Sequence, residues 1–177
     1  MKTFETVRAG AAGLCLAIAG GSLAGCAGKS APATTATAVP APARAPLVGR
    51  VTRAAVESYE SWKTLRAQDY TPDSAAVRTI AEHGQDVRTL LIFGTWCSSS
   101  RREVPRFFKI MDQAGIGLET VTMIGVDQSK KDAEGLTVKH EIRRVPTFVF
   151  FRGDREIGRV TEWAASLERD IAAILTK

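Results

Sequence analysis

The sequence is poor in three features that often reveal a function: cysteine, histidine and long runs of one charge. It has 3 cysteines and 2 histidines among 177 residues, and its 24 basic residues are interleaved with 19 acidic ones. Without a long basic run, the net charge of +5 does not indicate nucleic-acid binding. The histidines, His83 and His140, lack the spacing to a cysteine that a metal site requires, and no glycine-rich phosphate loop occurs. We therefore expect no metal, no cofactor and no nucleic-acid partner.

The N-terminal residues have the pattern of a secretory signal. Lys2 and Arg8 precede an uncharged run of small and apolar residues that is too short and glycine-rich for a permanent membrane helix. The run ends in "LAGC", Leu23 to Cys26, which resembles a bacterial lipobox. The resemblance implies a signal peptide over residues 1–25, lipidation of Cys26 and a location on the periplasmic side of a bacterial membrane. Ala27 favours the outer membrane. The alternative is an ordinary signal peptide with a chance cysteine.

On this interpretation the mature chain has a single free thiol. Cys15 leaves with the signal peptide, Cys26 carries lipid, and Cys97 remains. No disulfide can then form within the mature chain, although its compartment is oxidising. A thiol of this kind either reacts with a sulfur outside the chain or is buried.

The chain divides into a tether and a domain. Residues 26–49 consist largely of Ala, Pro and Thr and have almost no large apolar side chains. Such a segment cannot bury a core, so we expect a disordered tether. Residues 50–177 have the periodic apolar patterns of one folded domain.

Helical and strand patterns alternate along the domain. Helices are expected over residues 53–68, 71–84, 99–115 and 166–175, with Asp73 and Gly84 bounding the second and Pro105 kinking the third. Strands are expected over 86–94, 118–127, 147–151 and 156–160, the last two forming a hairpin, with a loop and short helix over 129–142. This order predicts an α/β domain with a mixed central sheet flanked by helices and an added N-terminal helical segment.

Four features of residues 86–175 match thioredoxin. Trp96 and Cys97 end a buried strand and open a helix, and Pro105 follows eight residues beyond the cysteine. The stretch "VPT", residues 145–147, stands before an apolar strand like the cis-proline loop of that family. Gly153 takes the place of the family's hairpin glycine. The region therefore resembles thioredoxin, which implies a thioredoxin-like fold and a cis peptide bond before Pro146.

The sequence departs from that family at two positions. The family motif is Cys-x-x-Cys, whereas this chain has Cys97-Ser98-Ser99-Ser100. Leu91 replaces the family's buried acid, six residues before the first cysteine, which in dithiol members assists proton transfer at the second sulfur. Because both parts that serve the second sulfur are missing, the resemblance implies a domain organised around one thiol.

We predict Cys97 and Ser100 as the catalytic residues. A helix N-terminus and Arg101 and Arg102 favour the thiolate form of Cys97, and burial opposes it. We expect Ser100 to donate a hydrogen bond to the thiolate, but a hydroxyl cannot release a mixed disulfide as a second cysteine does. Release then depends on a thiol from outside the chain. Ser98 and Ser99 are expected to cap the helix.

The predicted substrate-binding residues are Trp96, Val145, Pro146 and Thr147. The expected partner is a cysteine-containing protein or a small thiol, together with the membrane that holds the lipid anchor. Two functions follow from these residues. One is thiol–disulfide exchange by a single thiol, as in an isomerase or a trapping protein that lacks the resolving cysteine. The other is a redox-silent binding module or chaperone-like scaffold in which the thiol is incidental.

Overall fold

The computed structural model of the chain describes residues 45–59, 62 and 69–177. The predicted signal peptide, the lipidation site Cys26 and most of the tether lie outside the described residues, as does Leu65 of the first predicted helix. None of the described helices has both the length and the apolar character needed to cross a membrane.

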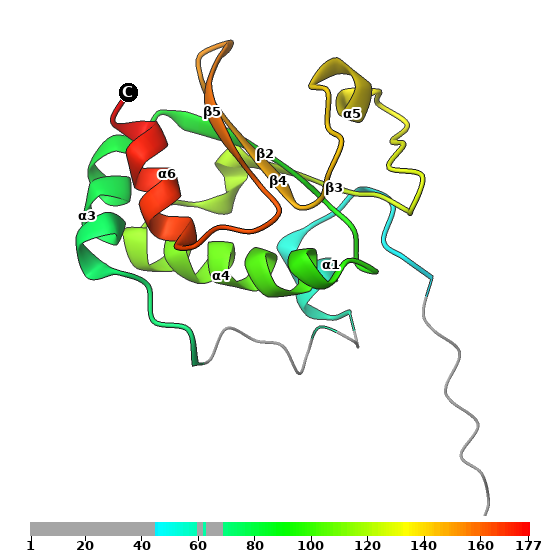
Figure 1. Ribbon diagram of the computed structural model, residues 1–177, viewed down its shortest axis with the longest axis horizontal. Coiled ribbons are helices and arrows are strands. Elements are labelled where there is room, and N and C mark those ends of the chain that lie inside the picture. The colour runs from blue at the N-terminus through cyan, green and yellow to red at the C-terminus, as the bar shows by residue number, and fades with distance from the viewer. Residues whose placement is uncertain (1–44, 60–61, 63–68) are drawn as a thin grey trace, which may run out of the picture. The chain divides into compact units, whose positions relative to one another are not determined.

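A five-stranded mixed sheet forms the centre of the domain (Figure 1). Its strands are β1 (Gly49–Arg50), β2 (Val87–Phe93), β3 (Val121–Gly125), β4 (Thr147–Arg152) and β5 (Arg155–Thr161). Their order across the sheet is β1-β3-β2-β4-β5, with β2 parallel to β3 and every other pair antiparallel. The apolar run of β2 is buried between two neighbouring strands, as expected for a central strand.

Strand β1 lies across the boundary at which we expected the tether to end. Gly49 pairs with Gly125, and the N–H of Leu47 donates to the hydroxyl of Thr95 at 3.2 Å. Residues 47–49 therefore contact the domain, because their backbone supplies hydrogen bonds to the edge of the sheet.

Among the described residues, the helices described in full are α1 (Arg53–Glu57), α3 (Ser74–His83), α4 (Ser98–Ala114), α5 (Leu136–Lys139) and α6 (Leu167–Leu175), with a 3-10 turn at Leu118–Thr120. One face of the sheet buries the larger apolar core against α1, α3, α4 and α6. The other face buries a smaller core under α5 and the segment from β3 to β4. Figure 1 shows α3, α4 and α6 gathered together and α5 apart from them. The predicted fold class is confirmed.

The first predicted helix is described only in part. Its start is α1, which follows Thr52, whose hydroxyl accepts from the N–H of Ala55, and which ends at Glu57. Residues 60–61 and 63–68 of the predicted helix lie outside the described residues. Tyr59 and Trp62 are buried in the core of the domain.

A buried carboxylate lies on α4, on a helix from which we expected only an apolar inner face. The side chain of Glu103 is fully buried. Its Oε1 accepts a hydrogen bond of 2.6 Å from Arg102 Nε and lies 3.6 Å from a guanidinium nitrogen of Arg106. Its Oε2 has no hydrogen-bond partner among the described residues. A charge in this position is tolerated only because cations are held beside it.

Both arginines also stack on aromatic rings from other parts of the chain. The Cζ of Arg102 lies 3.5 Å from the ring centroid of Trp163, and that of Arg106 lies 4.6 Å from the ring centroid of Tyr70. The Tyr70 hydroxyl donates to the carboxylate of Glu168, on α6. These contacts tie α4 to the segment that leads into α3 and to the start of α6.

Burial and hydrogen bonding shift the pKa values of Tyr70 and Glu168. Burial first, and then the hydrogen bond to Glu168, raises the pKa of Tyr70 above its ordinary value. Burial alone would raise the pKa of Glu168, but hydrogen bonds from Tyr70 and from the backbone, including the N–H of Asp73 at 3.1 Å, outweigh it. The pKa of Glu168 therefore lies below its ordinary value, and its ionised form stabilises the fold.

We predict that Glu103→Ala lowers the free energy of unfolding by about 3–5 kcal/mol, since it leaves two partly buried guanidinium groups without their counter-charge. Urea denaturation of the full chain measures the loss. The matched control is Glu82→Ala, which removes an exposed glutamate from α3 and should change the free energy of unfolding by less than about 0.5 kcal/mol. Equal effects of the two substitutions would contradict the role given to Glu103.

The depressed pKa of Glu168 predicts a pH-dependent contribution to stability. A carboxyl group of this kind stabilises the fold above its unfolded pKa of about 4.3, and the contribution is lost as the pH falls through the lower pKa of the folded state. Glu168→Gln should therefore cost roughly 1–2 kcal/mol at pH 7 and less at pH 3. Urea denaturation at both pH values checks this, with Asp170→Asn, exposed on the same helix, as the control. If the difference in unfolding free energy between the wild type and Glu168→Gln does not become smaller at pH 3, the stabilising role of ionised Glu168 is refuted.

Candidate functional site

Cys97 lies where the central strand β2 gives way to α4. It occupies the N-cap position of that helix with an extended backbone, φ −85° and ψ 126°. Its N–H donates to the carbonyl of Gly94 at 3.0 Å, and its own carbonyl accepts from the N–H of Arg101 at 3.0 Å. The side chain is half-buried. The backbone thus fixes the sulfur at the start of a helix of 17 residues, where the helix dipole favours negative charge.

The sulfur faces the loop that precedes β4. The thiol of Cys97 donates to the carbonyl oxygen of Val145 at 3.2 Å. The Val145–Pro146 peptide bond is cis, which confirms that prediction. Thr147 begins β4, and its hydroxyl donates to the carbonyl of Arg144 at 2.8 Å. The structure therefore brings three of the predicted binding residues together opposite the predicted nucleophile.

Ser100 makes a different contact from the one we expected. Its side chain is fully buried, and its hydroxyl accepts a hydrogen bond of 3.2 Å from the N–H of Gly94. Among the hydrogen bonds of the described residues, none joins Ser100 to Cys97. The hydroxyl closes the turn between β2 and α4, because Gly94 N–H would otherwise be a buried donor without a partner.

The expectation that Ser98 and Ser99 cap α4 is wrong. They are the first two residues inside the helix, and Cys97 holds the capping position without a side-chain hydrogen bond. The pattern of three serines is typical of a helix start, but it does not distinguish the cap from the residues that follow it.

The turn that carries the thiol is held on both flanks. Trp96 donates its indole N–H to the carbonyl of Val126 at 2.9 Å and is 37% exposed. On the other flank, the indole N–H of Trp62 donates to the carbonyl of Thr95 at 3.2 Å, and the ring of Trp62 lies 5.6 Å from that of Phe93. We expected Trp62 only to pack over the sheet. Its contact with Thr95 brings the N-terminal segment to within two residues of the cysteine.

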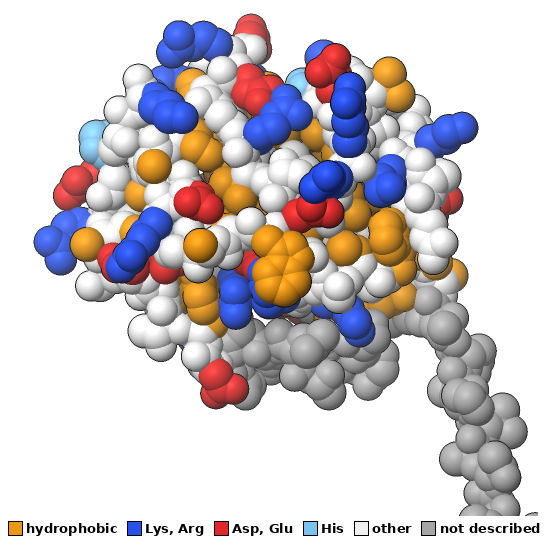
Figure 2. All heavy atoms as spheres, viewed as in Figure 1, with side chains coloured by type: hydrophobic (Ala, Val, Ile, Leu, Met, Phe, Trp, Pro, Cys, Tyr) orange, Lys and Arg blue, Asp and Glu red, His pale blue; other side chains and the backbone are white. Residues whose placement is uncertain are grey.

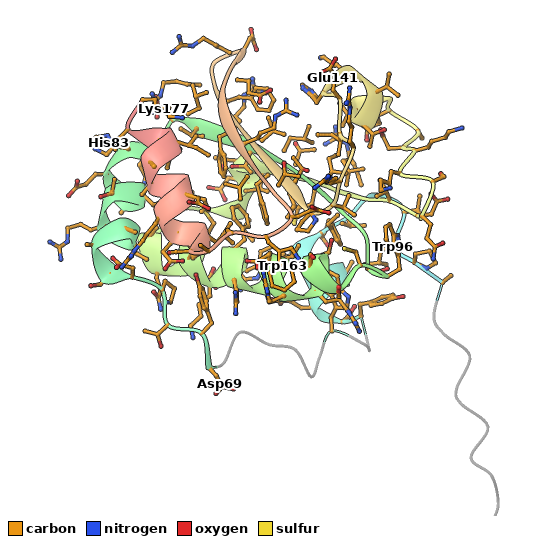
Figure 3. The ribbon with its side chains drawn as sticks, in the orientation of Figure 1. Asp69, His83, Trp96, Glu141, Trp163 and Lys177 are labelled. Carbon is orange, nitrogen blue, oxygen red and sulfur yellow. The ribbon has the colours of Figure 1, made fainter. Side chains whose placement is uncertain are left out.

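Two further residues, Glu162 and Trp163, lie at the site and were not predicted from the sequence. The N–H of Glu162 donates to the carbonyl of Pro146 at 2.7 Å, and its carboxylate pairs with Arg144 at 2.9 Å. Trp163, next in the chain, lies under Arg102 of α4 (Figure 3). In the sequence, Glu162 and Trp163 lie just beyond the predicted strand over 156–160, and nothing in that position indicates a site.

This arrangement provides one nucleophile and no internal partner for it. Cys97 is the only cysteine among the described residues. No cluster of metal-binding side chains is found among residues 45–59, 62 and 69–177. The thiolate of a cysteine so placed can attack a disulfide that an outside molecule brings to the Val145–Pro146 loop.

Several solved structures are similar to the chain. The germline-specific thioredoxin Deadhead of Drosophila melanogaster is 19% identical over 56% of this chain and 87% of its own, with a TM-score of 0.39. A Malassezia sympodialis thioredoxin is 30% identical over 53% of this chain and 79% of its own, with a TM-score of 0.38. A Pseudomonas aeruginosa protein of unknown function is 10% identical over 71% and 84%, with a TM-score of 0.47. No family model and no curated protein matches the chain.

The topology itself establishes the fold. The strand order β1-β3-β2-β4-β5 places the cysteine after the central strand, at the start of α4. The cis-proline loop stands opposite the sulfur, one strand away in the sheet. The chain has a thioredoxin-like fold.

Proposed function

We propose that the chain is a membrane-anchored thioredoxin-like protein that exchanges disulfides through the single thiol of Cys97. One observation carries the proposal: the sulfur stands at the N-terminus of α4, half-buried, 3.2 Å from the carbonyl of the residue before the cis-proline. An extended chain bound to the loop would bring its own sulfur close to that of Cys97.

The reaction is a thiol–disulfide exchange with no net oxidation of the pair. Cys97 loses its proton to water, and its thiolate attacks one sulfur of a partner disulfide. A new disulfide bond forms between Cys97 and the partner while the partner's own disulfide bond breaks. The second partner sulfur leaves as a thiolate and takes up a proton. A thiol from outside the chain, or a second cysteine of the partner, then attacks the mixed disulfide and frees Cys97.

A second function, a redox-silent binding module, is favoured by one contact. The thiol of Cys97 donates to the Val145 carbonyl at 3.2 Å, so the sulfur is already engaged by the loop of its own chain. In that case the fold serves as a scaffold and the loop as a docking site. The two functions differ in the reactivity of one sulfur.

We predict that Cys97 forms a persistent mixed disulfide with a peptide disulfide that releases a coloured thiol. The experiment uses the full chain with Cys15→Ser and Cys26→Ser, so that Cys97 is its only cysteine. One equivalent of coloured thiol should appear, faster than with free cysteine at pH 7, and mass spectrometry should show the protein–peptide adduct. Adding Cys97→Ser should abolish both signals. A rate equal to that of free cysteine would favour the redox-silent module.

Ser100→Cys in the same background tests whether only the second sulfur is missing. The replacement is nearly isosteric at a position already shaped for a small side chain, so the fold should survive. The introduced cysteine should displace the peptide from Cys97 and leave a disulfide within the chain, and turnover should appear in an insulin-reduction assay with dithiothreitol. Matched Ser98→Cys, exposed at the start of α4, should resolve the adduct more slowly. An adduct that persists unchanged in Ser100→Cys would contradict the proposal.

Anchoring is predicted to depend on Cys26. Cys26→Ala should move the protein from the membrane fraction to the soluble fraction and remove incorporation of a labelled fatty acid. Cys15→Ala, in the segment we assign to the signal peptide, should change neither. A wild-type chain that takes up no label, with membrane association unaffected by Cys26→Ala, would refute the lipid anchor.

A further inference from the structure

Two arginines stand immediately before the loop that faces Cys97. Arg143 and Arg144 precede Val145, and both side chains are exposed. Arg144 pairs with Glu162 at 2.9 Å while 68% of its side chain stays exposed. Among the described residues, no ion pair or hydrogen bond involves the side chain of Arg143. Glu141, also exposed, lies two residues before Arg143 and acts on Arg159, so Glu162 is the carboxylate that pairs with this arginine pair.

The helix on the other side of the sulfur is basic as well. Arg101 and Arg102 follow Cys97 on α4. Arg102 is paired with the buried Glu103, whereas the Nε of Arg101 is buried without a hydrogen-bond partner. Cys97 thus has two arginines after it on α4 and two before the opposing loop. Figure 2 shows Lys and Arg side chains interspersed with Asp and Glu around apolar groups on the face of the molecule turned toward the viewer.

An exposed aromatic ring accompanies this charge. Trp163 is 68% exposed although its ring stacks with Arg102 at 3.5 Å. It stays close to the cis-proline because its neighbour Glu162 is bonded to the carbonyl of Pro146. Figure 3 shows Trp163 in front of α4 and Trp96 near the start of that helix. Large exposed tryptophans rimmed by arginine are typical of protein contact surfaces.

The exposed arginines and the exposed ring of Trp163 together indicate which kind of partner fits this surface. A second copy of the chain would bring the same arginines to the contact and would be repelled. A small thiol would leave the exposed ring of Trp163 uncovered. A polypeptide with acidic side chains can pair with the exposed arginines and cover the ring of Trp163. Its backbone can also accept a hydrogen bond from the Val145 N–H, for which the described residues offer no acceptor.

We propose that the partner captured by Cys97 is a protein segment whose cysteine is flanked by Asp and Glu, with Arg143 and Arg144 binding the acidic side chains and Trp163 packing against an apolar one. This proposal rests on the exchange reaction proposed above and specifies its substrate class. The chemistry is the same exchange, in which the partner's disulfide supplies the sulfur that joins Cys97.

The test compares two peptides with one leaving thiol. Both carry a central cysteine in the same coloured disulfide and one tryptophan, and they differ only in flanking residues, four Glu in one and four Lys in the other. They react with the full chain carrying Cys15→Ser and Cys26→Ser. We expect the acidic peptide to react roughly tenfold faster in 20 mM salt, because opposite charges speed encounter. In 0.5 M salt the ratio should fall to about two, because salt screens exposed charges.

Variants locate the charges that matter. Arg143→Gln with Arg144→Gln should bring the low-salt ratio down to about two. The control is Arg155→Gln, which removes an exposed arginine from the start of β5, at the hairpin, and should keep the ratio near its wild-type value. Equal reduction by the control would show a general charge effect and overturn the assigned site.

Binding without reaction separates this proposal from the one on which it rests. Peptides with serine in place of cysteine are titrated into the Cys97→Ser chain and followed by fluorescence anisotropy. Tighter binding of the acidic peptide, lost in the Arg143 and Arg144 variant, supports the site even when Cys97 proves unreactive. Equal affinity for the two peptides, with equal reaction rates, overturns it even when the exchange reaction is confirmed.

Discussion

The carboxylate of Glu103 is the constraint on which the geometry of the site depends. A buried charge is costly, and here Arg102 and Arg106 offset that cost by lying against it. The same two guanidinium groups stack on Trp163 and Tyr70, so one carboxylate orients two contacts that reach other elements. These contacts join α4 to the segments that lead into α3 and α6, and so they restrain the helix whose start carries Cys97.

The N-terminal segment fixes the other end of the same turn. Leu47 and Trp62 bind the side chain and the carbonyl of Thr95, two residues before Cys97. Contacts on both the turn at Thr95 and the helix α4 that follows it restrict the movement of the Cys97 sulfur. A nucleophile held in this way loses less entropy when a partner arrives.

Local patterns predicted most of the fold and only part of the site. The apolar run of β2, the Asp73 cap of α3 and the proline of the loop each depend on a few neighbouring residues, so the sequence indicates them directly. Glu103 looked like one charge among several on α4. Its burial arises from packing against distant segments, and the link from Tyr70 to Glu168 joins residues 98 positions apart. The contact of Trp163 with Arg102 and the hydrogen bond of Ser100 were not predicted for the same reason, since the local sequence does not indicate either contact.

The missing second sulfur changes where selectivity must reside. In a dithiol protein a poor partner can be released from the mixed disulfide by the second cysteine, so a wrong capture is reversible from within the chain. Here Ser100 is buried and hydrogen-bonded to the N–H of Gly94, and Leu91 is fully buried. In the exchange that we propose, neither residue supplies a sulfur that could reverse a wrong capture. Discrimination between partners would then occur before the new disulfide bond forms, on the proposed surface of Arg143, Arg144 and Trp163. Exposed charges act at that stage, because they change the rate of encounter more than the strength of a covalent product.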